Sequence, residues 1–80
     1  MSSSNLAVGV NAFAITPHDS TNFTRSARAV YVGVAGNITA VFADGTAVLF
    51  TAVPQGSVLP IEVKRINATG TTATALVGIV

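Results

Sequence analysis

Few side chains in this sequence are able to carry out chemistry. The 80-residue chain has three carboxylates, four cationic side chains, one histidine and no cysteine. The consecutive residues His18, Asp19 and Ser20 have the residue types of a nucleophilic triad. A triad needs side chains that converge from separate elements, however, and neighbours on one loop cannot form that relay. So few titratable groups also leave little material for the clusters that active sites use. The sequence therefore predicts a protein that is not an enzyme.

Metal and nucleotide sites are weakly indicated. His18 with Asp19 could bind a metal on a symmetry axis, where one ligand set per subunit becomes several. The simpler interpretation is a loop histidine beside a turn-capping aspartate, which we favour. The glycines of residues 33–36 lack the Gly-Lys-Ser/Thr ending of a phosphate-binding loop and do not precede a helix, so they indicate a turn. We expect no metal and no cofactor.

The charge and hydropathy of the chain exclude two classes of partner. A net charge of +1 supplies no basic field for nucleic acid. The longest uncharged run, residues 45–61, is interrupted by Pro54 and Pro60 and falls short of the roughly 20 apolar residues of a spanning helix. The Met-Ser-Ser-Ser-Asn start lacks the basic residues of a secretory signal. We expect a soluble protein made in the cytoplasm, without a membrane partner.

The shortage of charge points to self-association. Only 9% of the residues are charged, against about 25% in an ordinary soluble domain. A chain of this size hides only about 60% of its surface on folding. Small domains compensate with disulfides, metals or oligomerisation, and here there is no cysteine and one histidine. A homo-oligomer is the expected solution.

The elements that must position these residues are predicted to be strands. Val, Ile and Thr dominate, and no stretch repeats apolar residues at helical spacing over three turns. Turn residues separate five predicted strands, at residues 29–34, 38–43, 46–53, 58–66 and 72–80. Pro60 marks the fourth as an edge strand or as the start of pairing. We expect an all-β fold, a small antiparallel β-sandwich or open barrel with an N-terminal arm.

The central hairpin suggests where subunits meet. Asp44-Gly45 is a strong two-residue turn signal, which would pair Ala43 with Thr46 and Phe42 with Ala47. Both faces of this hairpin would then be largely apolar, unlike a sheet with one face in water. In the fourth strand, Glu62 and Lys64 share a face that should see solvent. The candidate subunit-interface residues are Val41, Phe42, Val48 and Phe50.

Residues 1–26 differ in composition from the β-domain expected over residues 27–80. A polar start leads into an apolar stretch and then a loop, with Phe13 and Phe23 as aromatic anchors on either side. We expect an arm that wraps a neighbouring subunit or a partner; a first strand plus a loop that closes the core is the alternative. Arg25 and Arg28 follow the loop and could pair with a partner's carboxylates, or serve only as solubilising charges.

Several short motifs carry a family resemblance. They are Ala-Ile-Thr-Pro at 14–17, Asp-Ser-Thr at 19–21, Ala-Arg-Ala-Val-Tyr-Val-Gly at 27–33, Asp-Gly at 44–45, Val-Pro-Gln-Gly at 53–56, Leu-Pro-Ile at 59–61, Val-Lys-Arg-Ile at 63–66 and Ala-Thr-Gly-Thr-Thr-Ala-Thr at 68–74. Over residues 14–80 the chain resembles a family of small head-decorating or spike base proteins of tailed phages and gene transfer agents. The segment after the Lys-Arg pair is the most specific of these motifs.

The resemblance implies a virion structural protein on the outer surface of a capsid. Its partners would be sister subunits, as a trimer or else a pentamer, and the major capsid protein. The chain has no extension for attaching a fibre, which favours a cement or decoration protein that bridges capsomers over the base of a head spike or fibre at the vertices. A host-surface glycan-binding adhesion module is the other alternative. The capsid-binding candidates are Phe13, Phe23, Arg25 and Arg28.

Overall fold

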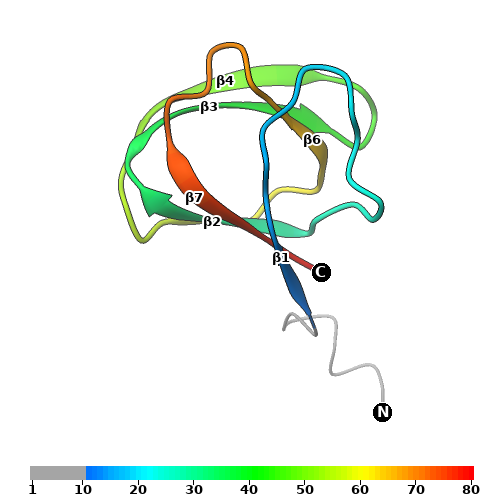
Figure 1. Cartoon of the computed structure of the whole chain (residues 1–80), viewed down its shortest axis with the longest axis horizontal. Helices are drawn as coiled ribbons and strands as arrows, with labels where there is room; N and C mark the ends of the chain where they lie inside the picture. The colour runs from blue at the N-terminus through cyan, green and yellow to red at the C-terminus, as the bar shows by residue number, and fades with distance from the viewer. Residues whose placement is uncertain (1–10) are drawn as a thin grey trace.

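The computed structural model describes residues 11–80, which form an all-β sandwich of two antiparallel sheets (Figure 1). The strands are β1 (Ala12–Ala14), β2 (Ala29–Val34), β3 (Gly36–Phe42), β4 (Ala47–Val53), β5 (Val58–Leu59), β6 (Val63–Asn67) and β7 (Thr74–Ile79). One sheet has the order β1-β7-β2-β5 and the other β4-β3-β6. The predicted fold class is confirmed. Within residues 11–80 no helix has the length and apolarity that crossing a bilayer would need.

The predicted strand over residues 58–66 is wrong, because it is two strands in different sheets. β5 ends at Leu59 and pairs with β2, whereas β6 begins at Val63 and pairs with β3. Pro60 follows β5 directly and has no N–H to donate to a ladder, so pairing stops there. The chain then crosses from one sheet to the other at Pro60, which lies in no strand but directly follows the edge strand β5.

The predicted register of the central hairpin is also wrong, by one residue. β3 pairs Val41 with Ala47 and Ala40 with Val48, instead of Phe42 with Ala47. The Gly45 N–H donates to the Phe42 carbonyl at 2.8 Å, and Gly45 has φ of 95°. This is a three-residue loop in which a turn is followed by a left-handed glycine. A slip of one residue moves every β4 side chain to the opposite face.

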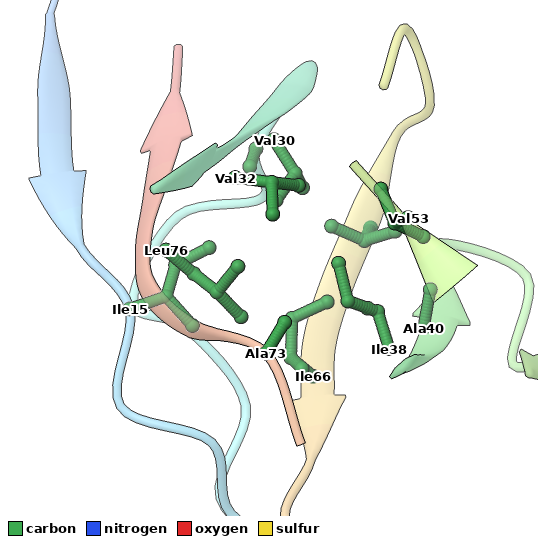
Figure 2. Packing of buried hydrophobic residues seen from close by; sticks show 11 residues of the cluster. Ile15, Val30, Val32, Ile38, Ala40, Val53, Ile66, Ala73 and Leu76 are labelled. Atoms are coloured by element: carbon green, nitrogen blue, oxygen red, sulfur yellow. The ribbon is translucent and has the colours of Figure 1, made fainter. Parts of the chain in front are cut away.

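The core lies between the two sheets and is wholly apolar. Val30, Val32 and Leu76 project from one sheet toward Ile38 and Ile66 of the other (Figure 2). These side chains are at most 2% exposed, and no polar side chain is buried among residues 11–80. With no buried polar group to orient it, the core depends on the alternation of the strands to direct its side chains inward.

Residues 11–26 belong to the sandwich. β1 pairs with β7, Ile15 is buried, and its N–H donates to the Leu76 carbonyl at 2.9 Å. The loop that follows crosses to the second sheet, where the N–H groups of His18 and Phe23 donate to carbonyls of β6. For this part of the chain the alternative of a first strand and a closing loop describes the structure. Residues 1–10 of the expected arm lie outside the described residues.

Candidate interaction surface

A hollow with a volume of about 570 Å³ lies between β1 and the loop of residues 16–25. Phe13 of β1 and Phe23 of the loop both line it, with their ring centroids 5.1 Å apart and their planes at 72°. This edge-to-face arrangement is the favoured geometry of an aromatic pair. Both rings are half-buried and also pack against the core. The hollow therefore has a packed aromatic pair in its wall, beside polar residues of the loop.

The Phe13 ring packs against the backbone of a glycine on the neighbouring strand. Gly78 of β7 is its cross-strand partner. A Cβ at Gly78 would lie 2.6 Å from Cζ of the Phe13 ring, closer than any real contact. The ring therefore lies directly on the glycine backbone, and the missing side chain makes the room for it.

The loop that forms the other wall is tied down by its own polar side chains. Nδ1 of His18 accepts hydrogen bonds from the backbone N–H groups of Ser20 and Thr21, at 3.1 and 3.2 Å. Arg65 donates to Asn22 Oδ1 at 2.9 Å through Nη1 and to Asn67 Oδ1 at 2.9 Å through Nε. These bonds fix the loop at both its start and its middle.

Asp19 connects the same loop to the turn after β6. Its Oδ1 accepts the Thr69 N–H at 2.8 Å and its Oδ2 accepts the Thr69 hydroxyl at 2.7 Å. These bonds favour the ionised form, so the backbone N–H and then the hydroxyl of Thr69 lower the pKa of the Asp19 carboxyl below its ordinary value. Asp19 is a structural tie between loops.

The three residues with triad chemistry do not form a relay. The Ser20 hydroxyl is 3.4 Å from Nδ1 of His18, but that nitrogen already accepts two backbone N–H groups. Asp19 faces Thr69 instead of orienting the imidazole. Across residues 11–80 no three His, Asp or Glu side chains gather in a group that could hold a metal ion. His18 therefore accepts hydrogen bonds from the turn of its own loop, whereas Asp19 accepts them from a distant turn instead of its own.

The structure brings together three of the four capsid-binding candidates. Phe13, Phe23 and Arg25 all line the hollow, and Arg25 is exposed beside the aromatic pair. Arg28 is exposed as well but does not line it; its backbone N–H donates to the Ile79 carbonyl at 2.7 Å. A hollow lined by an aromatic pair and a guanidinium can receive an apolar side chain together with a carboxylate.

The four subunit-interface candidates do not share one face. Phe42, Val48 and Phe50 lie on the face toward the core, with Phe42 and Phe50 half-buried and their ring centroids 6.4 Å apart. Phe42 and Val48 also line a second, open hollow of about 470 Å³. Val41 points to the opposite face and is only 2% exposed, so it has little surface to offer a partner.

The corrected register exposes a residue that sequence reasoning missed. With Phe42 opposite Ala47, Leu49 would share a face with Ile38. It lies instead opposite Thr39 on the outer face and is 51% exposed. A glycine at the third position of a three-residue hairpin loop was the signal that could have found it.

Comparison with known proteins shows a close similarity to a chain of a solved capsid structure. No protein-family model matches it, and no match was found among curated proteins. A chain in the solved capsid of a native gene transfer agent particle, computed with C5 symmetry, is 39% identical to it, with a TM-score of 0.82. The match covers 90% of this chain and 83% of that one. The protein therefore belongs to the same family as this chain of the gene transfer agent capsid.

Proposed function

We propose that this protein is a virion structural protein that decorates the outside of a tailed-phage-type capsid and stabilises the head by bridging capsomers. The observation that carries the proposal is the 39% identity, over 90% of the chain, to a chain of a gene transfer agent capsid. Likeness to a capsid chain favours a structural role over a catalytic one. The hydrogen bonds that occupy His18 and Asp19 point the same way.

The hollow between β1 and the loop of residues 16–25 is the proposed contact with the major capsid protein. Phe13 and Phe23 offer partly exposed aromatic surface, and Arg25, which also lines the hollow, offers a planar fork of donors. Interface contacts of this kind concentrate binding energy in aromatic and arginine side chains. Arg28 extends the cationic surface beyond the hollow. The matching capsid element would present an apolar side chain next to a carboxylate.

The decorating unit is a homo-oligomer, with a trimer favoured. The low charge content supports self-association, and so do the large apolar side chains that remain exposed in a single copy, among them Val34 and Val48. An oligomer contacts several capsomers at once, so its contacts must break together and its avidity exceeds the affinity of each. This is the physical basis of a cement function.

A pentamer that forms the base of a head spike at the vertices is the alternative. The similar capsid structure was computed with C5 symmetry, and a pentamer would be compatible with that symmetry. Native mass spectrometry of the purified protein distinguishes a trimer from a pentamer. A stable folded monomer at micromolar concentration would contradict both.

Binding to purified empty capsids tests the proposal. Co-sedimentation should recover the wild-type protein with the capsids, and Arg25→Glu should reduce the recovery at least tenfold, roughly the loss of one charge-assisted contact. Lys64→Glu is the matched control, because it changes the net charge equally but lies outside the hollow. Binding to a glycan array without binding to capsids would support an adhesion module instead.

A further inference from the structure

β4 is an open sheet edge. It is an outer strand of the β4-β3-β6 sheet, and the only strand with which it pairs in the described chain is β3. From Ala47 to Thr51 it contains no charged residue, proline or glycine, and only Phe50 is even half-buried. Exposed edges of this kind present unpaired N–H and C=O groups to any strand that approaches.

The other edges of the sandwich are short or covered. On β6, at the far side of the same sheet, the carbonyls of Lys64 and Ile66 accept the N–H groups of Phe23 and His18. β5 has two residues and is followed by Pro60, and β1 has three. Among the residues that the structure describes, β4 is therefore the one long edge without a cover.

The register identifies which backbone groups face outward. The Phe42 N–H donates to the Thr46 carbonyl at 2.7 Å, so residue 46 and, by alternation, Val48 and Phe50 point their backbone groups at β3. Ala47, Leu49 and Thr51 then direct theirs to the open edge. The edge ends at Ala52, which has φ of 53° and whose N–H donates to Asn37 Oδ1.

We infer that the β4 edge pairs with β4 of a second copy of this chain, antiparallel about a two-fold axis at Leu49. Leu49 would then face Leu49 of the second copy, and Ala47 would face Thr51. Each of these pairs exchanges two N–H···O bonds. The two three-stranded sheets would join into one continuous sheet, with the two Leu49 side chains in contact on its outer face.

Length and charge favour a second copy as the occupant. The three residues of β4 whose backbone groups point outward need a partner strand with an open edge of the same length. Among the described strands, β4 itself has such an edge. Self-pairing about Leu49 brings no like charges together, because residues 46–53 carry none. It also covers Leu49, which is 51% exposed in a single copy. A two-fold contact of this kind can join one ring of subunits to the next.

Charge swapping at position 49 tests the pairing. Leu49→Lys should abolish the contact, because two lysines would face each other across the axis, and Leu49→Glu should do the same. Mixing the two variants should restore it as a one-to-one complex in native mass spectrometry, with at least tenfold tighter association than either variant alone. Val58→Lys and Val58→Glu, at a site 53% exposed on β5, are the matched controls. Circular dichroism of each variant before mixing confirms that it is folded.

Cysteine cross-linking tests the register independently, because the chain has no cysteine of its own. Leu49→Cys should be joined to a second copy by a short thiol-specific cross-linker, since directly opposite Cα atoms lie about 5.5 Å apart. Thr51→Cys alone should not be joined, but a mixture of Thr51→Cys and Ala47→Cys chains should be.

Three outcomes would overturn the inference. One is failure of the Lys and Glu variants to recombine while both remain folded. Another is equal cross-linking of Leu49→Cys and of a control variant, Val58→Cys, on β5. The third is loss of capsid binding by both position-49 variants with no change in self-association, which would assign the edge to a strand of the capsid protein. The self-association measurements need no capsid, so their result is independent of the proposed function.

Discussion

Asp19 and Thr69 are joined by two hydrogen bonds across fifty residues of sequence, one to the Thr69 backbone N–H at 2.8 Å and one to its hydroxyl at 2.7 Å. The contact attaches the loop beside the aromatic hollow to the turn that follows β6. Because both donors favour the carboxylate, they lower the pKa of Asp19 from its ordinary value of 3.8. Protonation of Asp19 therefore weakens the contact that holds the loop of residues 16–25 to this turn.

The Asp19 contact should stabilise the fold at neutral pH and fail in acid. A lowered pKa in the folded state adds stability that is fully present above pH 3.8 and is lost as the pH falls through the folded-state pKa. Asp19→Asn should therefore lower the thermal unfolding midpoint at pH 7, and the difference from wild type should shrink below pH 3.8. Glu62→Gln is the charge-matched control. A difference that stays constant from pH 7 to pH 3 would contradict this account.

Gly78→Ala should disturb the hollow from beneath. The new Cβ would lie 2.6 Å from the Phe13 ring, and forcing the ring away should cost about 1–3 kcal/mol in the free energy of unfolding. The cost should fall sharply in a Phe13→Ala background, because the obstructing ring is then absent. Chemical denaturation of the four proteins in this cycle measures the coupling. Equal costs in the two backgrounds would show that Phe13 does not contact Gly78.

Gly45→Ala should cost about 1–2 kcal/mol in the free energy of unfolding, through backbone strain alone. Gly45 has φ of 95°, and a Cβ there would meet nothing within 4 Å. Gly45→Asn should cost less, since asparagine tolerates the left-handed region better. Equal costs for alanine and asparagine, measured by chemical denaturation, would argue against the three-residue turn.

Ile66→Ala should be among the most damaging core changes. Ile66 is fully buried between the sheets, so removing its side chain should cost about 2–5 kcal/mol, and Ile66→Val about 0.5–1.5 kcal/mol. Val58→Ala, at a position 53% exposed, should change stability by no more than about 0.5 kcal/mol. Thermal and denaturant unfolding of the three variants tests this order.

Truncation at residue 26 is a poor test of capsid binding. Such a deletion removes β1, the buried Ile15 and the loop that caps β6. It would therefore expose two more sheet edges and part of the core as well as removing the hollow. Point changes at Arg25 keep those contacts and isolate the surface.

Local residue chemistry was enough to predict much of the fold. Val, Ile and Thr content, turn residues and the absence of helical spacing predicted an all-β sandwich, and residues 29–34 were predicted as the strand that β2 forms. The motifs at residues 14–21, 27–33 and 68–74 suggested a structural protein of tailed phages or gene transfer agents, and the chain is similar to a gene transfer agent capsid chain. The decorating or spike base family stays a prediction. Of the four capsid-binding candidates, Phe13, Phe23 and Arg25 line one hollow, and their contact with a capsid stays a prediction.

Tertiary structure decided the features that depend on strand pairing and on contacts between distant loops. Asp44-Gly45 signals a turn, but whether that turn has two or three residues depends on how β3 and β4 align, and one residue decides whether Leu49 faces inward or outward. The same holds for Asp19, whose partner Thr69 is fifty residues away and can be found only once the strands between them are placed. Sequence patterns act through neighbours along the chain, whereas register and loop ties are long-range contacts. The open edge of β4 likewise depends on long-range strand pairing, which leaves one side of β4 without a neighbour.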